Sequence, residues 1–213
     1  YSTVTNAFGK NTSYKFDSIA GILKTTSIDG IASENCDSTV KNITYYDNGQ
    51  VKTKTDNNGN LKYFEYNERG LNKLTEIYSS SRIKNTNYTN IAADKRTITE
   101  WLPSYPAISK VIEHGLTTNY KYYDNNLIES ITHTSTKLVS DDGHIQTAFE
   151  DRAWLFSYEY YDDKRYSKKI IDGPRTDIQD ITEYTYSPEG NITSISDVFN
   201  KMTQIGHTRS DTV

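Results

Sequence analysis

The chain has little cysteine, no long apolar run and no block of one charge, and each shortage excludes a class of protein. Cys36 is the single cysteine of 213 residues, which rules out an internal disulfide or a cysteine-based zinc cluster. No run approaches the roughly 18 apolar residues of a membrane-spanning helix, so we expect no membrane insertion. The 24 Lys and Arg and 28 Asp and Glu are interspersed, which argues against nucleic-acid binding.

The N-terminus also lacks familiar features. Tyr1-Ser2-Thr3-Val4 contains neither an initiator Met nor a signal-peptide pattern. We therefore expect the chain to be excised from something longer, with any targeting information outside it.

Aliphatic residues are few, and aromatic residues take their place. Hydrophobic residues make up 34% of the chain, and the helix-favouring Ala and Leu are scarce beside the strand-favouring Ile and Thr. The 18 Tyr and two Trp supply large apolar area, and each ring carries a polar tip that can reach water or a partner. The composition predicts a mostly β protein with aromatic apolar surfaces.

An aromatic-x-aromatic triplet recurs along the chain. Because side chains alternate faces along a strand, each triplet is expected to place two rings on one side of a sheet. The paired rings are Tyr14 and Phe16, Phe64 and Tyr66, Tyr120 and Tyr122, Tyr158 and Tyr160, and Tyr184 and Tyr186.

A residue that tolerates a left-handed backbone follows many of these rings at a fixed distance of four residues. Such a residue is required by a hairpin built from a type I turn and a bulge, so each unit reads as strand, tight turn, strand. The pairs are Tyr45 and Gly49, Tyr66 and Gly70, Tyr122 and Asn126, and Tyr186 and Gly190. This spacing selects Tyr45 and Tyr122 as the ring positions, so Tyr46 and Tyr123 are expected to point the other way, off the main aromatic face.

A second motif, found at residues 5–9 and 55–59, is expected to connect successive hairpins. The longer segments 5–17 and 55–67, which contain it, align without a gap. Together the two motifs define units of roughly 20 residues, a length found in repeat architectures. We interpret residues 1–213 as one repeat array truncated at both ends. Residues 78–115 are interpreted as degenerate repeats, and residues 135–151 as a surface loop.

Chemical sites find little support. His114, His133, His144 and His207 have no metal-ligand spacing, so we expect no metal and no cofactor. The acidic residues Asp56, Asp124, Asp162 and Asp163 are explained by turns. We predict no catalytic residue.

Several phrases resemble RHS/YD-repeat proteins. Tyr-x-Tyr-Asp followed by Gly, then Thr-Asp-x-x-Gly, is similar to the repeat of that family. The segments 172–177, 181–191, 96–103 and 119–122 resemble stretches common in bacterial RHS proteins. The resemblance covers nearly the whole chain.

The resemblance implies an all-β fold in which tandem β-hairpin repeats form a curled, spiralling antiparallel sheet, part of a hollow shell. In bacterial toxins of the family such a shell encloses a C-terminal effector, and in teneurins it serves cell-surface adhesion. The family's self-cleaving core and its toxic domain have no counterpart in these residues.

We therefore expect a non-catalytic shell segment of a secreted or cell-surface bacterial RHS protein, whose partners are the rest of the shell and a C-terminal toxin. The alternative is an adhesion module that binds carbohydrate or a partner cell surface through exposed tyrosines such as Tyr46 and Tyr123. Rings that pack across neighbouring strands are the favoured reading of the tyrosine ladder. Unpaired strand edges also predict edge-to-edge self-association.

Overall fold

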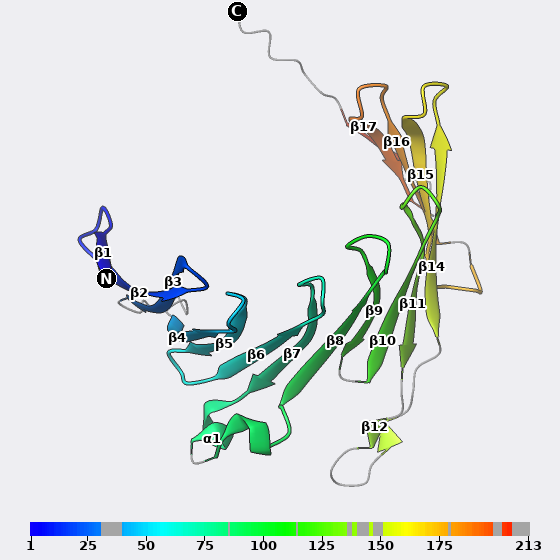
Figure 1. Cartoon of the computed structure of the whole chain (residues 1–213). Helices are drawn as coiled ribbons and strands as arrows, with labels where there is room; N and C mark the ends of the chain where they lie inside the picture. Colours follow the sequence, from blue (N-terminus) through cyan, green and yellow to red (C-terminus); the bar gives the residue numbers. More distant parts are fainter. Residues whose placement is uncertain are drawn as a thin grey trace, which may run out of the picture. The chain divides into compact units, whose positions relative to one another are not determined.

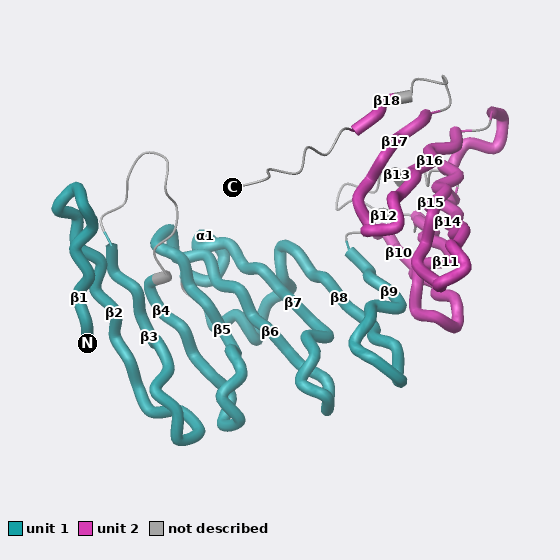
Figure 2. Tube along the Cα trace, turned by 90° about the horizontal axis from the view of Figure 1, so that it is seen from above, with its two compact units in different colours: residues 1–114 teal, residues 115–213 magenta. Residues whose placement is uncertain are grey.

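The computed structural model describes residues 1–30, 40–84, 86–113, 115–135, 138–139, 145–146, 151–178, 180–197 and 202–205. Cys36, His114, His144, His207 and most of the predicted loop 135–151 lie outside the described residues. The chain divides into two compact units, residues 1–114 and 115–213, which are teal and magenta in Figure 2.

The first unit consists mainly of antiparallel strands joined by short turns (Figure 1). Strands β1, β2 and β3 form one sheet, and β4 to β9 lie side by side in chain order in another. Helix α1 and a 3-10 helix lie between β7 and β8. The elements are β1 (Ser2–Thr5), β2 (Asn11–Ile19), β3 (Ile22–Gly30), β4 (Val40–Tyr45), β5 (Val51–Asp56), β6 (Leu61–Tyr66), β7 (Asn72–Tyr78), α1 (Ser80–Ile83), the 3-10 helix (Tyr88–Asn90), β8 (Lys95–Trp101) and β9 (Ile108–Glu113).

The second unit repeats the pattern. Its strands lie in the order β10, β11, β14, β15, β16, β17 and β18, and β12 and β13 form a separate two-stranded ladder. The elements are β10 (Leu116–Tyr122), β11 (Ile128–Ser135), β12 (Leu138–Val139), β13 (Ile145–Gln146), β14 (Arg152–Tyr160), β15 (Tyr166–Asp172), β16 (Ile181–Tyr186), β17 (Ile192–Ser196) and β18 (Met202–Gln204).

Strand pairing confirms the all-β, antiparallel hairpin fold that the sequence predicted. Strands that follow one another pair with one another, for example β6 with β7 and β15 with β16. The interval interpreted as degenerate repeats contains α1, the 3-10 helix and the β8–β9 pair. In the described part of the chain, no helix is long and apolar enough to span a membrane.

Little of the apolar surface is deeply buried, because the strands of each unit lie in a single layer (Figure 1). The buried apolar side chains of the described residues are Ile43, Leu74 and Tyr78. Without a second layer to pack against, such a sheet depends on cross-strand pairs and on contacts between neighbouring hairpins. Contacts between hairpins are therefore a main source of stability for each unit.

One turn type recurs throughout. The N–H of its first residue donates to the carbonyl of the residue four positions later, and the N–H of its fourth residue donates back to the first carbonyl. These turns begin at Asn6, Tyr46, Asp56, Asn67, Tyr123, Tyr161 and Ser187.

The fourth residue of each turn has the left-handed backbone that the spacing predicted. Gly49, Gly70, Asn126 and Gly190 all have a positive φ, between 68° and 86°. Lys164 also has a φ of 68°, which its residue type did not predict because Lys rarely adopts this conformation. In five hairpins the pairing register shifts at the aromatic ring that ends the first strand, as a turn with a bulge requires. These rings are Tyr45, Tyr66, Tyr122, Tyr160 and Tyr186.

Candidate functional site

Three turns begin with tyrosine, and we refer to residues 46–49, 123–126 and 161–164 as the tyrosine turns. In the first of them, Tyr46 N donates to Gln50 O at 2.8 Å and Gly49 N donates to Tyr46 O at 2.8 Å. The side chain of Asn48 caps the turn, because its Oδ1 accepts from Gln50 N at 3.0 Å. The Tyr46 side chain is not needed for turn closure and is free for another contact.

The Tyr46 side chain reaches the next hairpin. Its hydroxyl donates to the Phe64 carbonyl of β6 at 2.9 Å and lies 3.1 Å from the Tyr63 hydroxyl. Its ring packs edge-on against Tyr66, with centroids 6.3 Å apart and an interplanar angle of 85°. Since β5 lies between β4 and β6, this contact ties the β4–β5 hairpin to the β6–β7 hairpin.

The other tyrosine turns make the same tie in the second unit. Tyr123, after β10, donates its hydroxyl to the Phe156 carbonyl of β14 at 2.8 Å. Tyr161, after β14, donates its hydroxyl to the Tyr186 carbonyl of β16 at 2.6 Å. In each case the acceptor belongs to the first strand of the following hairpin.

These contacts correct the expectation that Tyr46 and Tyr123 lie off the aromatic face. Tyr46 packs against Tyr66, and Tyr123 packs edge-on against Tyr158 with centroids 6.2 Å apart. The physical reason is that both residues belong to turns, where the alternation of strand side chains no longer applies. The repeated Tyr-Tyr-Asp spelling was the available signal for their shared role.

A second tie joins the same pairs of hairpins along the turns. Gln50 Nε2 donates to Gly70 O at 2.9 Å, and Asn125 Nδ2 donates to the Tyr160 hydroxyl at 2.8 Å. Arg165 donates to the Pro188 carbonyl. Each tyrosine turn is thus held to the following hairpin at two points.

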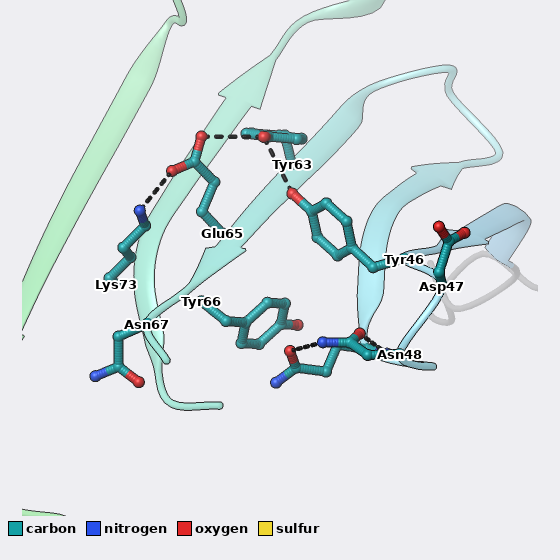
Figure 3. A pocket seen from close by; sticks show the side chains of 9 residues that line it. Tyr46, Asp47, Asn48, Tyr63, Glu65, Tyr66, Asn67 and Lys73 are labelled. Atoms are coloured by element: carbon teal, nitrogen blue, oxygen red, sulfur yellow. Dashed lines mark hydrogen bonds and ion pairs between the residues drawn. The ribbon is translucent and has the colours of Figure 1, made fainter. Parts of the chain in front are cut away.

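The hollow beside the first tyrosine turn is open and has a volume of about 540 Å³ (Figure 3). Glu65 accepts a hydrogen bond from the Tyr63 hydroxyl at 3.0 Å and pairs with Lys73 at 3.3 Å. Burial, together with the hydrogen bonds to Tyr46 and Glu65, raises the pKa of Tyr63 above its ordinary value. Tyr63 is therefore a neutral hydrogen-bonding group, and the arrangement serves attachment better than proton transfer.

Several other signature rings contact neighbouring side chains or strands. Tyr14 and Phe16 stack along one strand, β2, with centroids 6.4 Å apart, and the Tyr45 hydroxyl of β4 donates to Thr25 O of β3 at 2.5 Å. Tyr186 packs edge-on against Tyr166 at 5.2 Å, and Tyr166 in turn lies 6.2 Å from Tyr158. The ladder of the second unit therefore runs across neighbouring strands.

Three of the polar residues weighed as chemical sites, His133, Asp56 and Asp163, have structural partners. His133 packs against Trp154 with ring centroids 4.6 Å apart. Asp56 closes its own turn by accepting from Asn60 N at 2.8 Å, and Asp163 accepts from Arg165 N at 3.1 Å. Among the described residues, no group of three or more His, Cys, Asp or Glu is placed to hold a metal ion.

Comparisons with known proteins bear on the fold. No protein-family model matches the chain, and no curated protein matches it. The chain is similar to a Photorhabdus luminescens Tc holotoxin pore structure that carries a TccC3 mutation, with a TM-score of 0.57 and 10% identity over 91% of this chain and 11% of that chain. It is also similar to a crystal structure of TcdB2-TccC3-Cdc42, with a TM-score of 0.58 and 14% identity over 95% of this chain and 10% of that chain.

The chain thus spans about a tenth of the length of the toxin chains that it matches. At this level of identity the likeness concerns the fold, and it confirms the RHS-type fold that the sequence implied.

Proposed function

We propose that this RHS-type fold serves as a wall segment of a hollow shell, in a larger protein that encloses a C-terminal effector. The observation that carries the proposal is the match of nearly the whole chain to a small part of two Tc toxin chains. A wall segment needs rigidity over a wide surface and no catalytic group of its own. Single-layer sheets with hairpins tied one to the next meet that need.

The tyrosine turns support this role because each one contacts the next hairpin along the chain. Tyr46, Tyr123 and Tyr161 each tie one hairpin to the hairpin that follows it in the chain. A single layer of strands bends easily, because nothing packs on its faces to resist hinge motion between hairpins. Two contacts between each pair of successive hairpins would stiffen the wall without a second layer.

The adhesion alternative, which relied on exposed side chains of Tyr46 and Tyr123, is less well supported. The hydroxyls of both residues donate to backbone carbonyls, and their rings pack edge-on against Tyr66 and Tyr158. We propose that the parent is a secreted or cell-surface protein, that the other parts of the shell and the effector are its partners, and that unpaired edges make an isolated segment self-associate.

Limited proteolysis of the complete protein tests the proposal. The region that follows the repeats should resist protease in the native protein and become sensitive in a variant with Tyr46→Ala, Tyr123→Ala and Tyr161→Ala. Phe8→Ala is the matched control, because the Phe8 ring is 89% exposed and its loss should leave protection unchanged. Cleavage of that region at the same rate in the native protein and the triple variant would contradict an enclosing role.

A further inference from the structure

A second open hollow lies beside the Tyr123 turn in the second unit, with a volume of about 430 Å³. The turn contributes Tyr123, Asp124 and Asn125, and strand β14 contributes the rest of the lining: Ser157, Tyr158 and Tyr160. Three tyrosine rings and one carboxylate therefore line a single hollow.

The hollow is held in shape by contacts at the hydroxyl ends of its rings. Tyr123 donates to Phe156 O at 2.8 Å, and Asn125 Nδ2 donates to the Tyr160 hydroxyl at 2.8 Å. Tyr123 and Tyr158 meet at an interplanar angle of 80°, so two of the rings form a corner. Tyr123 is 38% and Tyr160 45% exposed, which leaves ring surface open to a ligand.

Aromatic rings elsewhere in this protein carry a cation over their faces. Lys52 Nζ lies 5.5 Å from the centroid of Tyr46, the counterpart of Tyr123 in the first unit. Lys169 Nζ lies 5.4 Å from the Phe156 centroid and 5.8 Å from the Tyr184 centroid. A cation within about 6 Å of a ring centroid is attracted by the negative face of the ring.

In the described part of the second unit, the Tyr123 turn has no lysine at the position that Lys52 holds in the first unit. Lys52 is six residues after Tyr46, and the residue six positions after Tyr123 is Glu129. Glu129 pairs with Lys121 at 2.7 Å. Among the described residues, no cation lies over Tyr123, Tyr158 or Tyr160, and the exposed ring surface of Tyr123 and Tyr160 therefore has no counterpart of Lys52.

We propose that the hollow beside Tyr123 is an aromatic cage that binds a small quaternary ammonium cation. The rings of Tyr123, Tyr158 and Tyr160 supply the negative faces, and Asp124 supplies the countercharge. This binding site goes beyond the role of a wall segment, and a wall could function with the cage empty.

Titration of the full chain with choline, followed by NMR, tests the cage. The control ligand is the neutral carbon analogue of choline, in which carbon replaces nitrogen, because it has the same shape without the charge. We expect choline to bind at least about tenfold more tightly than this analogue. Equal binding of the two ligands, or no binding of choline, would overturn the proposal.

Substitutions at Asp124 and Glu129 leave the three rings in place. Asp124→Asn should weaken choline binding about fivefold, and Glu129→Lys should abolish it by supplying the cation that Lys52 supplies in the first unit. Asp162→Asn is the matched control, because Asp162 holds the same place in the Tyr161 turn and does not line the hollow. A loss of affinity in Asp162→Asn equal to that in Asp124→Asn would contradict the assignment.

The source of the quaternary ammonium group is resolved by two further probes. Phosphatidylcholine vesicles present the group as a lipid headgroup, and trimethyllysine presents it as a modified side chain. Binding of either probe that is lost in Glu129→Lys supports the cage and identifies the source. Binding that persists in Glu129→Lys counts against it.

Discussion

The Tyr46 turn and the Asn67 turn lie in the same unit and close their hairpins with the same pair of backbone hydrogen bonds. They differ in the use of the first side chain. Asn67 Oδ1 accepts from Arg69 N and Leu71 N, both at 3.0 Å, so the first residue caps its own turn. In the Tyr46 turn, Asn48 caps the turn and the Tyr46 side chain contacts the neighbouring hairpin.

The comparison separates two jobs that a turn can perform. Closure of the hairpin is local, and either an Asn at the first position or an Asn two residues later achieves it. Coupling between hairpins is nonlocal, and in the tyrosine turns the first side chain supplies it. The Asn67 turn is coupled instead through Arg69, whose guanidinium donates to Leu102 O at 2.6 Å and Pro103 O at 3.0 Å.

Removal of a whole side chain gives the largest expected contrast. Tyr46→Ala loses the ring contact with Tyr66 and the hydroxyl tie to Phe64, so we expect the free energy of unfolding to fall by about 3 kcal/mol. Asn67→Ala loses a local cap and should cost about 1 kcal/mol. Urea titration of the two variants checks the order, and equal losses would remove the distinction between the two turns.

The fourth position of the turn should matter in the same way whatever the first residue is. Gly190 has a φ of 86° and open space around its missing Cβ, so Gly190→Ala should cost about 1–2 kcal/mol through the backbone alone. Lys164→Gly should stabilise the chain by about 1 kcal/mol, because it relieves a strained φ of 68°. Thermal unfolding of both variants measures these effects, and a destabilising Lys164→Gly would show that the Lys164 side chain has another role.

Removal of the hydroxyl alone separates the hydrogen bond between hairpins from the packing of the ring. Tyr123→Phe and Tyr161→Phe keep their rings and lose one hydrogen bond each, so each should lower the free energy of unfolding by about 1 kcal/mol. Tyr160→Phe, at the second tie of the Tyr123 turn, is a useful comparison, because its hydroxyl accepts from Asn125. Urea midpoints that stay unchanged in all three variants would contradict a stabilising role for the ties.

Alkaline pH should weaken the tyrosine network modestly. Because the pKa of Tyr63 is raised in the folded state, its neutral form stabilises the protein fully below the unfolded pKa of 10.0. That contribution is lost as the pH rises from about 10 towards the folded pKa. The free energy of unfolding should therefore decline over about pH 10 to 12. The decline should be smaller in Tyr63→Phe, and the same decline in this variant would exclude Tyr63 as a contributor.

Much of the fold could be predicted because it depends on local rules. The aromatic triplets and the spacing to Gly49, Gly70, Asn126 and Gly190 report strands and turns, which nearby residues determine. Lys164 was missed because its left-handed backbone is enforced by the hairpin around it and not by its own preference.

The ties between hairpins were harder to predict. The direction of the Tyr46 and Tyr123 side chains depends on which carbonyl the next hairpin places nearby, and alternation along a strand gives no information about a turn. Lys52 lies over the Tyr46 ring, whereas Glu129 holds the same position relative to Tyr123. Which residue lies beside each ring depends on the strand register at the bulge, which the sequence alone does not define.

Hydrogen exchange tests most directly the claim that tyrosine turns couple successive hairpins. Exchange should be measured by mass spectrometry on the full chain, on Tyr123→Phe and Tyr161→Phe, and on Asn67→Ala as the local control. We predict faster exchange in β14 for Tyr123→Phe and in β16 for Tyr161→Phe, whereas Asn67→Ala should affect mainly its own hairpin. Faster exchange confined to the substituted turn in the two tyrosine variants would contradict the coupling.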